Sequence, residues 1–175
     1  MTPIQLEEIT LIGLSLGKTT TNANGQAAID CGTLWQKFEK GNYAATIPGK
    51  LTNEIVAVYH NYEGDFTQPY SYFIGVKVKA DAEVPKGLEK LSIPKASYQK
   101  IESKGIIPDC IANSWTDIWN SQMARAYKAD FEVYDDRSKD WKNGVVDIFI
   151  SVNWTISREE EAKMQRLLTA KAQKR

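Results

Sequence analysis

The sequence predicts an α+β fold in which one antiparallel sheet carries two main helices, followed by a C-terminal helix. Two observations lead to this prediction. The first is that the predicted order strand–helix–strand–strand occurs twice. The second is that short segments at corresponding places are similar in sequence: "GTLWQKF", "AVYHNYEGD" and "YFIGVKV" in the first half correspond to "NSWTDIW", "EVYDDRSKD" and "IFISVNW" in the second. We interpret the chain as a tandem βαββ duplication with pseudo-twofold symmetry, which puts a pocket between the repeats.

The elements of the first half follow from its hydrophobic spacing. Residues 4–20 are predicted to form a strand, and residues 25–41 a helix. The apolar residues at helical spacing in that helix are Ala28, Cys31, Leu34, Trp35 and Phe38. Residues 53–62 and 70–80 are predicted as two strands, joined by the polar, turn-rich residues 63–69.

The second half repeats this order. Residues 91–103 are predicted as a strand and residues 108–126 as a helix, before strands at 129–135 and 145–154. The helix places Ile111, Trp115, Ile118, Trp119 and Met123 along one face. We assign residues 1–155 to one domain and residues 156–175 to a C-terminal helical extension.

The C-terminal segment has the signals of a helix. Ser157 and Glu160 form a capping-box pattern, and acidic residues come first and basic residues last, as the helix dipole favours. Met164, Leu167 and Leu168 make a narrow apolar stripe. That stripe either packs on the chain's own domain or makes a weak contact with a second copy or another partner.

Composition excludes several classes of function. The 175 residues contain 42% hydrophobic residues, and 22 basic side chains balance 22 acidic ones, so we expect one globular domain that binds no nucleic acid directly. No apolar run is long enough to span a membrane and no secretory signal precedes the domain, so we expect a cytoplasmic protein. A single histidine, His60, and two distant cysteines, Cys31 and Cys110, give no basis for a metal site or a cofactor.

Glu132 is the most unusual residue of the predicted strand "ADFEVYD". Alternate residues of a strand face opposite sides, so Phe131 and Val133 share one face, whereas Glu132 and Tyr134 share the other. Two interpretations remain open. Glu132 faces solvent, or it is buried, where it would have a raised pKa, pair with a tyrosine hydroxyl, or receive a cationic guest between aromatic side chains.

At these residues the sequence resembles a known family. "DFEVYDD" after "SWTDIW", preceded by "SIPKASY" and "AVYHNYEGD", is similar to the GyrI-like small-molecule-binding family, the AraC-type bacterial effector-binding domain, over residues 4–154. "TTTNANGQAAIDCGTLWQKF" resembles stand-alone members without a DNA-binding domain. The resemblance implies an aromatic pocket between the two repeats, with a buried glutamate that receives cationic, lipophilic ligands.

The resemblance also implies which residues form the site. Its glutamate corresponds to Glu132, and strand parity adds Tyr134. The expected aromatic residues of the pocket are Tyr59, Trp115, Trp119, Trp35 and, with strand parity uncertain by one residue, Phe149. Each tryptophan has the alternative of an ordinary core position. Trp141 follows in a polar loop, where it forms either a lid or an incidental surface anchor.

Three functions remain open from the sequence. The first is binding of amphipathic, cationic or aromatic small molecules for sensing or sequestration. The second is a hydrolase that opens a strained electrophile with Glu132 as general base and Tyr134 as hydrogen-bond donor. The third is regulation of a protein partner, such as inhibition of a topoisomerase. The same fold serves all three, and we favour binding over catalysis.

Overall fold

The computed structural model describes residues 2–155 and 157–172 and confirms the α+β class, with eight strands in one antiparallel sheet. The strands are β1 (Ile4–Leu6), β2 (Ile9–Ser15), β3 (Ile55–His60), β4 (Ser71–Lys77), β5 (Glu89–Ile93), β6 (Ala96–Gly105), β7 (Ala129–Tyr134) and β8 (Gly144–Ser151). The helices are α1 (Gln26–Lys40), α2 (Tyr43–Thr46), α3 (Asp109–Trp119) and α4 (Arg158–Ala172), with short 3₁₀ turns η1 (Ala23–Gly25) and η2 (Asp136–Ser138).

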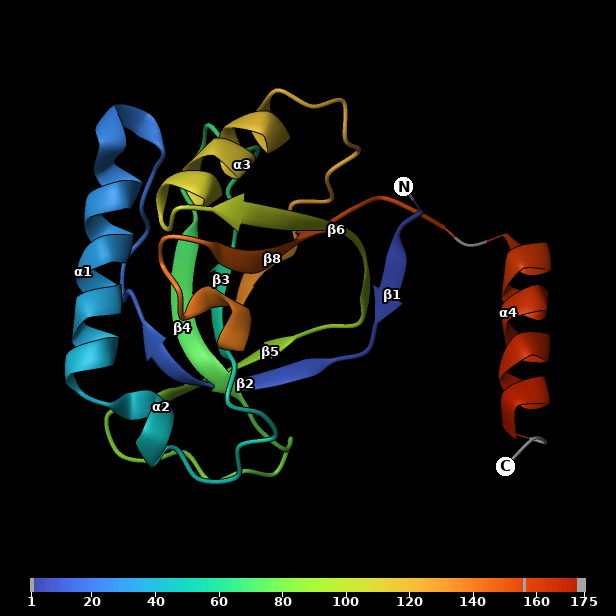
Figure 1. The fold of residues 1–175 in the computed structure, drawn as a ribbon, viewed down its shortest axis with the longest axis horizontal. Coiled ribbons are helices and arrows are strands. Elements are labelled where there is room, and N and C mark those ends of the chain that lie inside the picture. Colours follow the sequence, from blue (N-terminus) through green and yellow to red (C-terminus); the bar gives the residue numbers. More distant parts are fainter. Residues whose placement is uncertain (1, 156, 173–175) are drawn as a thin grey trace.

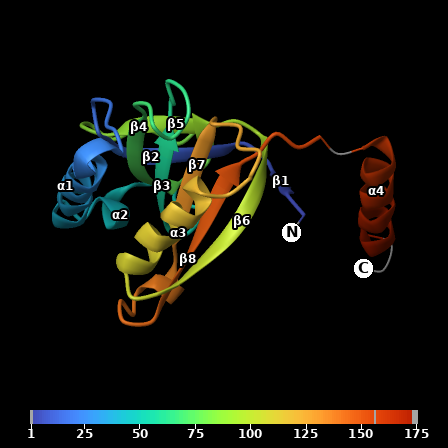
Figure 2. The same ribbon diagram turned by 90° about the horizontal axis from the view of Figure 1, so that it is seen from above.

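The strand order of the sheet is β1-β6-β8-β7-β3-β4-β2-β5. Corresponding strands of the two halves are arranged symmetrically in this order, which we call palindromic. The β3–β7 pair lies at its centre, and each side continues with the corresponding strands of the two halves, β4 and β2 on one side and β8 and β6 on the other. Figures 1 and 2 show the sheet curling, with α1 and α3 on the same face of it. This order agrees with the pseudo-twofold arrangement, while its origin in a tandem duplication stays a prediction.

Two long predicted strands are each divided in the structure. The predicted strand over residues 4–20 becomes β1 and β2, which lie near opposite ends of the sheet because β1 pairs with β6, whereas β2 pairs with β4 and β5. The predicted strand over residues 91–103 becomes β5 and β6. The breaks fall at charged Glu7 and Glu8 and at Pro94, which has no N–H for the ladder.

The helix predicted over residues 108–126 ends early, at Trp119. Ser121 donates a hydrogen bond from its hydroxyl to the carbonyl of Ile118 at 2.7 Å, and the Met123 N–H donates to Ser121 Oγ at 3.3 Å. These side-chain bonds compete with helix continuation. The chain then runs extended, so that Arg125 pairs with Val152 beside the sheet.

Apolar residues form a core on each face of the sheet. Under α1, Leu34 and Phe38 pack against β2, β3 and β4, and under α3, Trp115 and Ile118 pack against β8. The opposite face, inside the curl, holds a third cluster: Leu11, Val56, Val58, Phe73, Ile93, Tyr98, Ala129, Phe131 and Val133. Burial of the apolar surface in these three clusters is the main stabilising contribution to the fold.

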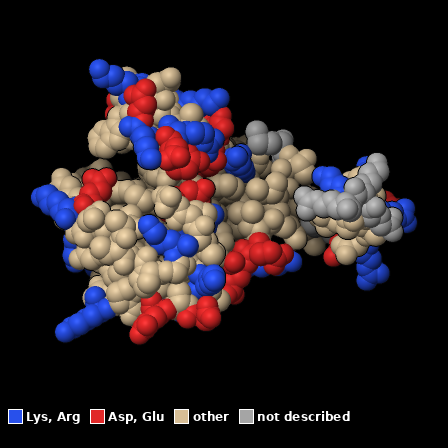
Figure 3. Space-filling model, turned by 60° about the horizontal axis from the view of Figure 1, so that its bottom comes forward, with Lys and Arg blue, Asp and Glu red and all other residues tan. Residues whose placement is uncertain are grey.

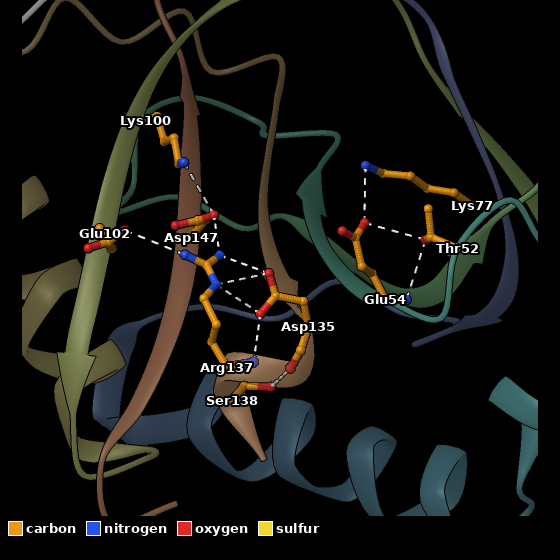
Figure 4. Close-up of polar contacts among 9 residues, drawn as sticks. All are labelled: Thr52, Glu54, Lys77, Lys100, Glu102, Asp135, Arg137, Ser138 and Asp147. Carbon is orange, nitrogen blue, oxygen red and sulfur yellow. Dashed lines mark hydrogen bonds and ion pairs between the residues drawn. The ribbon is translucent and has the colours of Figure 1, made fainter. Parts of the chain in front are cut away.

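A polar cluster links the turn after β7 to β6 and β8 (Figure 4). Arg137 of η2 contacts Asp147 of β8 at 2.6 Å and Asp135 at 2.8 Å, and reaches Glu102 of β6 at 3.5 Å. The hydrogen bonds from Arg137 are the main reason that the pKa of Asp135 is lowered. Arg137 thereby ties the turn after β7 to the two neighbouring strands, which is a structural role.

The C-terminal helix α4 forms as predicted but stands clear of the domain (Figures 1 and 2). The capping box is confirmed, because the Glu160 N–H donates to Ser157 Oγ at 3.3 Å and the Ser157 N–H donates to Glu160 Oε2 at 3.0 Å. None of the residues of α4 is buried, so packing on its own domain is wrong. Its apolar stripe stays a predicted partner contact.

The surface is mixed in charge on the face drawn in Figure 3, where basic and acidic side chains are interspersed with broad uncharged areas. Of the described helices, none combines the length and hydrophobicity that a membrane crossing requires.

Candidate functional site

Glu132 lies in the middle of β7, at the centre of the face that carries the helices. Its register partners are Ala57 on β3 and Ile148 on β8, and its side chain is only 1% exposed. The exposed-strand interpretation is therefore wrong. Glu132 and Tyr134 share this face, as strand parity predicts.

Three neutral donors hold the Glu132 carboxylate. Tyr59 Oη and Trp115 Nε1 donate to Oε1 at 2.8 and 2.7 Å, and Tyr134 Oη donates to Oε2 at 2.5 Å. The donors come from β3, α3 and β7, so the two halves of the chain converge on one carboxylate. Within residues 2–155 and 157–172, no basic side chain forms an ion pair with Glu132.

Burial and hydrogen bonding act in opposite directions on Glu132. Burial raises the pKa of this carboxyl above its ordinary value, and the bonds from Tyr134, Trp115 and Tyr59 offset part of that increase. Burial also raises the pKa of Tyr59 and of Tyr134 well above the usual range, so both hydroxyls keep their protons and remain donors. The site is thus a buried acid with three neutral hydrogen-bond donors and no countercharge from the described part of the chain.

Two cavities flank this carboxylate along the groove between α1 and α3. The first, which we call the Tyr59 pocket, measures about 300 Å³. Its aromatic lining residues are Tyr59, Tyr62, Phe66, Tyr70, Trp115 and Trp119, and small side chains of α1 and α3 form its sides. The second, the Trp35 pocket, measures about 520 Å³ and is lined by Trp35, Tyr134 and Trp141 among others. Glu132 lines neither cavity directly, whereas its three donors do.

The remaining predicted residues fall in three places. Trp119 stacks on Phe66 in the Tyr59 pocket, with ring centroids 5.6 Å apart. Trp35 packs edge-on against Tyr134, a donor to Glu132, with ring centroids 4.8 Å apart, and its Nε1–H donates to Tyr72 Oη at 2.8 Å. The exposed Trp141 is among the residues that line the Trp35 pocket, and both interpretations of it, a lid or a surface anchor, stay predictions.

Phe149 requires a correction, because it lies on the opposite face of the sheet. It pairs with Phe131 across β7 and β8 and stacks on that ring at 4.8 Å. The register gives Ile148, and not Phe149, the side of β8 that faces Glu132. The predicted strand parity was therefore wrong by one residue.

Sequence reasoning missed a second buried charge beside the Tyr59 pocket. Arg125 Nη2 lies 2.8 Å from Asp130 Oδ2, with side chains 4% and 0% exposed. The Arg125 guanidinium also lies over the rings of Tyr127 and Trp115, at 4.3 and 5.8 Å. Parity could have indicated Asp130, which shares the face of Glu132, but Arg125 fell inside a predicted helix.

A loop after β3 supplies the aromatic residues that sequence reasoning left out. Asn22 Nδ2 donates to the Phe66 carbonyl at 2.8 Å, and Tyr70 Oη donates to Asn22 Oδ1 at 2.7 Å. These bonds fix Phe66 over the pocket. The predicted polar connection 63–69 thus contributes an aromatic side chain to the site.

The fold and site together define an effector-binding domain: a curled sheet with two helices over an aromatic groove and a buried acid. The model of a family described as integron-associated effector binding protein matches residues 4–152. The chain belongs to this family, and its GyrI-like resemblance is confirmed.

Individual relatives agree with this assignment. The integron cassette protein VCH_CASS2 from the mobile metagenome of Vibrio cholerae is 25% identical, with a TM-score of 0.65 and coverage of 87% of this chain and 95% of that one. SAV2435, solved bound to tetraphenylphosphonium, is 18% identical, with a TM-score of 0.70 and coverage of 87% and 93%. The putative transcriptional regulator protein YobU of Bacillus subtilis (strain 168) is 25% identical over 123 residues, which are 68% of this chain and 77% of YobU.

Proposed function

We propose that this protein binds lipophilic aromatic cations in the Tyr59 pocket, for sensing or sequestration. The observation that carries the proposal is Glu132, a buried acid with neutral donors and, in the described chain, no ion-pair partner. A cationic guest would supply the missing countercharge. The faces of Tyr59, Trp115 and Trp119 would add cation–π attraction and apolar contact area.

The choice of the Tyr59 pocket over the Trp35 pocket rests on the hydrogen bonds to Glu132. Two of its three donors, Tyr59 and Trp115, line the first cavity, and only Tyr134 lines the second. Arg125 also lines the Tyr59 pocket, but its charge is balanced by Asp130 at 2.8 Å. A ligand there would meet the net negative charge of Glu132. SAV2435, a relative in fold, was solved with tetraphenylphosphonium, which supports a cation of this kind as the first probe.

A hydrolase is less well supported than a binding protein. A general base needs a carboxylate oxygen that reaches the substrate or its water. Glu132 Oε1 already accepts two hydrogen bonds, Oε2 accepts one at 2.5 Å, and the residue lines neither cavity. Regulation of a protein partner has no comparable observation in its favour.

The finer organisation is part of the same proposal. We infer that the site lies between two duplicated βαββ repeats, which the palindromic strand order supports. We further infer action in the cytoplasm, where the free thiols of Cys31 and Cys110 would stay reduced.

Calorimetric titration with tetraphenylphosphonium tests the charge. We expect wild type to bind this cation and to discriminate against tetraphenylborate, an anion of the same shape. Glu132→Gln should weaken cation binding roughly tenfold or more, since two charges several ångströms apart at an effective dielectric constant of about 20 attract by on the order of 2 kcal/mol. Equal affinity for both ions, or an unchanged affinity in Glu132→Gln, would contradict the proposal.

Matched tryptophan variants test the location. Trp119→Ala removes an aromatic wall of the Tyr59 pocket, and Trp35→Ala removes one of the Trp35 pocket. We expect Trp119→Ala to weaken cation binding several-fold, because an aromatic face contributes on the order of 1 kcal/mol to a bound cation. A larger loss in Trp35→Ala would move the site to the other cavity.

A further inference from the structure

A third cavity lies on the opposite face of the sheet, inside its curl. It measures about 450 Å³ and has both His60 and Tyr98 in its lining. Tyr98 belongs to the apolar cluster of that face, and His60 follows two residues after Val58, another member. The Tyr59 pocket lies on the helix-bearing face, so the two cavities are separated by the sheet. We call the cavity inside the curl the His60–Tyr98 pocket.

The strand register explains why this hollow exists. His60 on β3 pairs with Ala129 on β7, and Tyr98 on β6 pairs with Ser151 on β8. The β7–β8 ladder ends at the Phe131–Phe149 pair, and the Ser151 N–H donates instead to Asp130 Oδ1 at 2.7 Å. Ala129 therefore puts a small side chain beside His60 on the face inside the curl. Ala129 and Ala96, both in the cavity lining, leave open space next to His60 and Tyr98.

The inner end of the His60–Tyr98 pocket has hydrogen-bonding capacity that the described residues leave unused. His60 Nε2 and Tyr98 Oη are both buried, and neither has a hydrogen-bond partner in the described part of the chain. Buried polar atoms are nearly always paired, so two unpaired ones in a single cavity indicate a polar guest. Burial raises the pKa of Tyr98 to about 12 and lowers that of His60, so both side chains are neutral and can each donate or accept.

The exposed part of the cavity lining is basic. Lys95 and Lys128 both line it and are exposed. Lys95 pairs with Glu7 at 3.0 Å, whereas Lys128 forms no ion pair with any residue that the structure describes. Leu91, Ile93 and Ala129 supply apolar surface to the same lining. The cavity thus combines two buried neutral polar atoms, apolar side chains and two exposed lysines.

We propose that the His60–Tyr98 pocket is a second ligand site, for a small hydroxyaryl carboxylate. The ligand hydroxyl would exchange hydrogen bonds with Tyr98 Oη and His60 Nε2 at the inner end. The ring would lie against Ile93 and Ala129, and the carboxylate would face Lys128 and Lys95. This ligand class is opposite in charge to the cation proposed for the Tyr59 pocket, and nothing in this site depends on Glu132.

The probe is 4-hydroxybenzoate, with benzoate and phenol as partners that each lack one end. Calorimetry would measure affinity on the full-length protein, and backbone amide NMR shifts would locate the contact. We expect shifts at residues 93–98 and 128–129. We expect benzoate and phenol each to bind at least about fivefold more weakly than 4-hydroxybenzoate, since each loses one set of polar contacts.

Two variants test the two kinds of polar contact in the pocket, and a third variant serves as the control. Tyr98→Phe keeps the ring and should weaken 4-hydroxybenzoate about fivefold while leaving benzoate unchanged. Lys128→Gln should weaken 4-hydroxybenzoate and benzoate alike. Glu132→Gln, which alters the other face, should change neither affinity.

Three results would overturn the proposal. The first is no shift at these amides with any probe, which would mean that the two polar atoms bind only water. The second is an unchanged affinity for 4-hydroxybenzoate in Tyr98→Phe. The third is loss of that affinity in Glu132→Gln, which would mean that 4-hydroxybenzoate binds on the helix-bearing face.

Discussion

Two carboxylates on one strand face, Asp130 and Glu132, solve the same physical problem differently. Both are buried on β7, two residues apart. Asp130 has a guanidinium, Arg125, at 2.8 Å, together with hydrogen bonds from Ser151 and from Tyr62. Glu132 has hydrogen bonds of similar length but only from neutral donors. Asp130 is therefore complete in the folded chain, whereas Glu132 has no counterion among the residues that the structure describes.

The difference explains why we propose Glu132, and not Asp130, as the binding carboxylate. Removing a charge from water is costly, and hydrogen bonds from neutral groups offset only part of the cost. In the Arg125–Asp130 pair the two charges neutralise each other within the protein, and the pair holds the segment after α3 against β7 and β8. The attraction of Glu132 for a cation remains available to a guest. A structural carboxylate and a candidate binding carboxylate are thus neighbours on one strand.

The largest expected effect comes from breaking the Arg125–Asp130 pair. Arg125→Met should destabilise the fold by about 3–5 kcal/mol, because it leaves a buried carboxylate without its partner. Urea unfolding followed by circular dichroism measures this change. The double variant Arg125→Met/Asp130→Asn should recover a part of it. A cost no greater than that of losing one donor to Glu132 would erase the contrast between the two acids.

An intermediate effect is expected from removing one neutral donor. Tyr134→Phe deletes the 2.5 Å hydrogen bond to Glu132 Oε2 and keeps the ring against Trp35. We expect a loss of about 1.5–3 kcal/mol at pH 8, the usual range for a hydrogen bond to a charged group. Since this bond lowers the pKa of Glu132, the loss should shrink at pH 4, where the acid is protonated in both proteins. A loss that does not change with pH would mean that the bond is to a neutral acid throughout.

The smallest effect on stability is expected from Glu132→Gln, and its pH dependence carries the information. The folded pKa of Glu132 is raised above its ordinary value of 4.5, so ionisation opposes folding at every pH above that value. The stability of wild type relative to Glu132→Gln should therefore be highest below about pH 4.5 and should fall as pH rises through the folded pKa. Thermal unfolding of both proteins from pH 4 to pH 8 measures it. A difference that grows in the opposite direction would show that the native site stabilises the anion.

Part of the site could be predicted from the sequence because strand alternation is local. Parity placed Glu132 and Tyr134 on one face, and the first-half strand contributed Tyr59 to the same carboxylate. The helical spacing placed Trp115 toward the sheet. The prediction for Phe149 was wrong because it also depended on strand alternation, and a one-residue error in parity moves a side chain to the other face of the sheet.

The sequence by itself determined the α+β class, the repeated element order, the helices α1 and α3 and the capped C-terminal helix, because these depend on spacing within a few residues. Only the tertiary structure decided which buried acid has a cation. Arg125 reaches Asp130 because Ser121 ends α3 early and the following segment runs beside β8. Likewise, the hollow beside His60 and Tyr98 is lined by residues of β3, β5, β6 and β7, which only the folded sheet brings together. Such pairings join residues distant along the chain, so no local pattern records them.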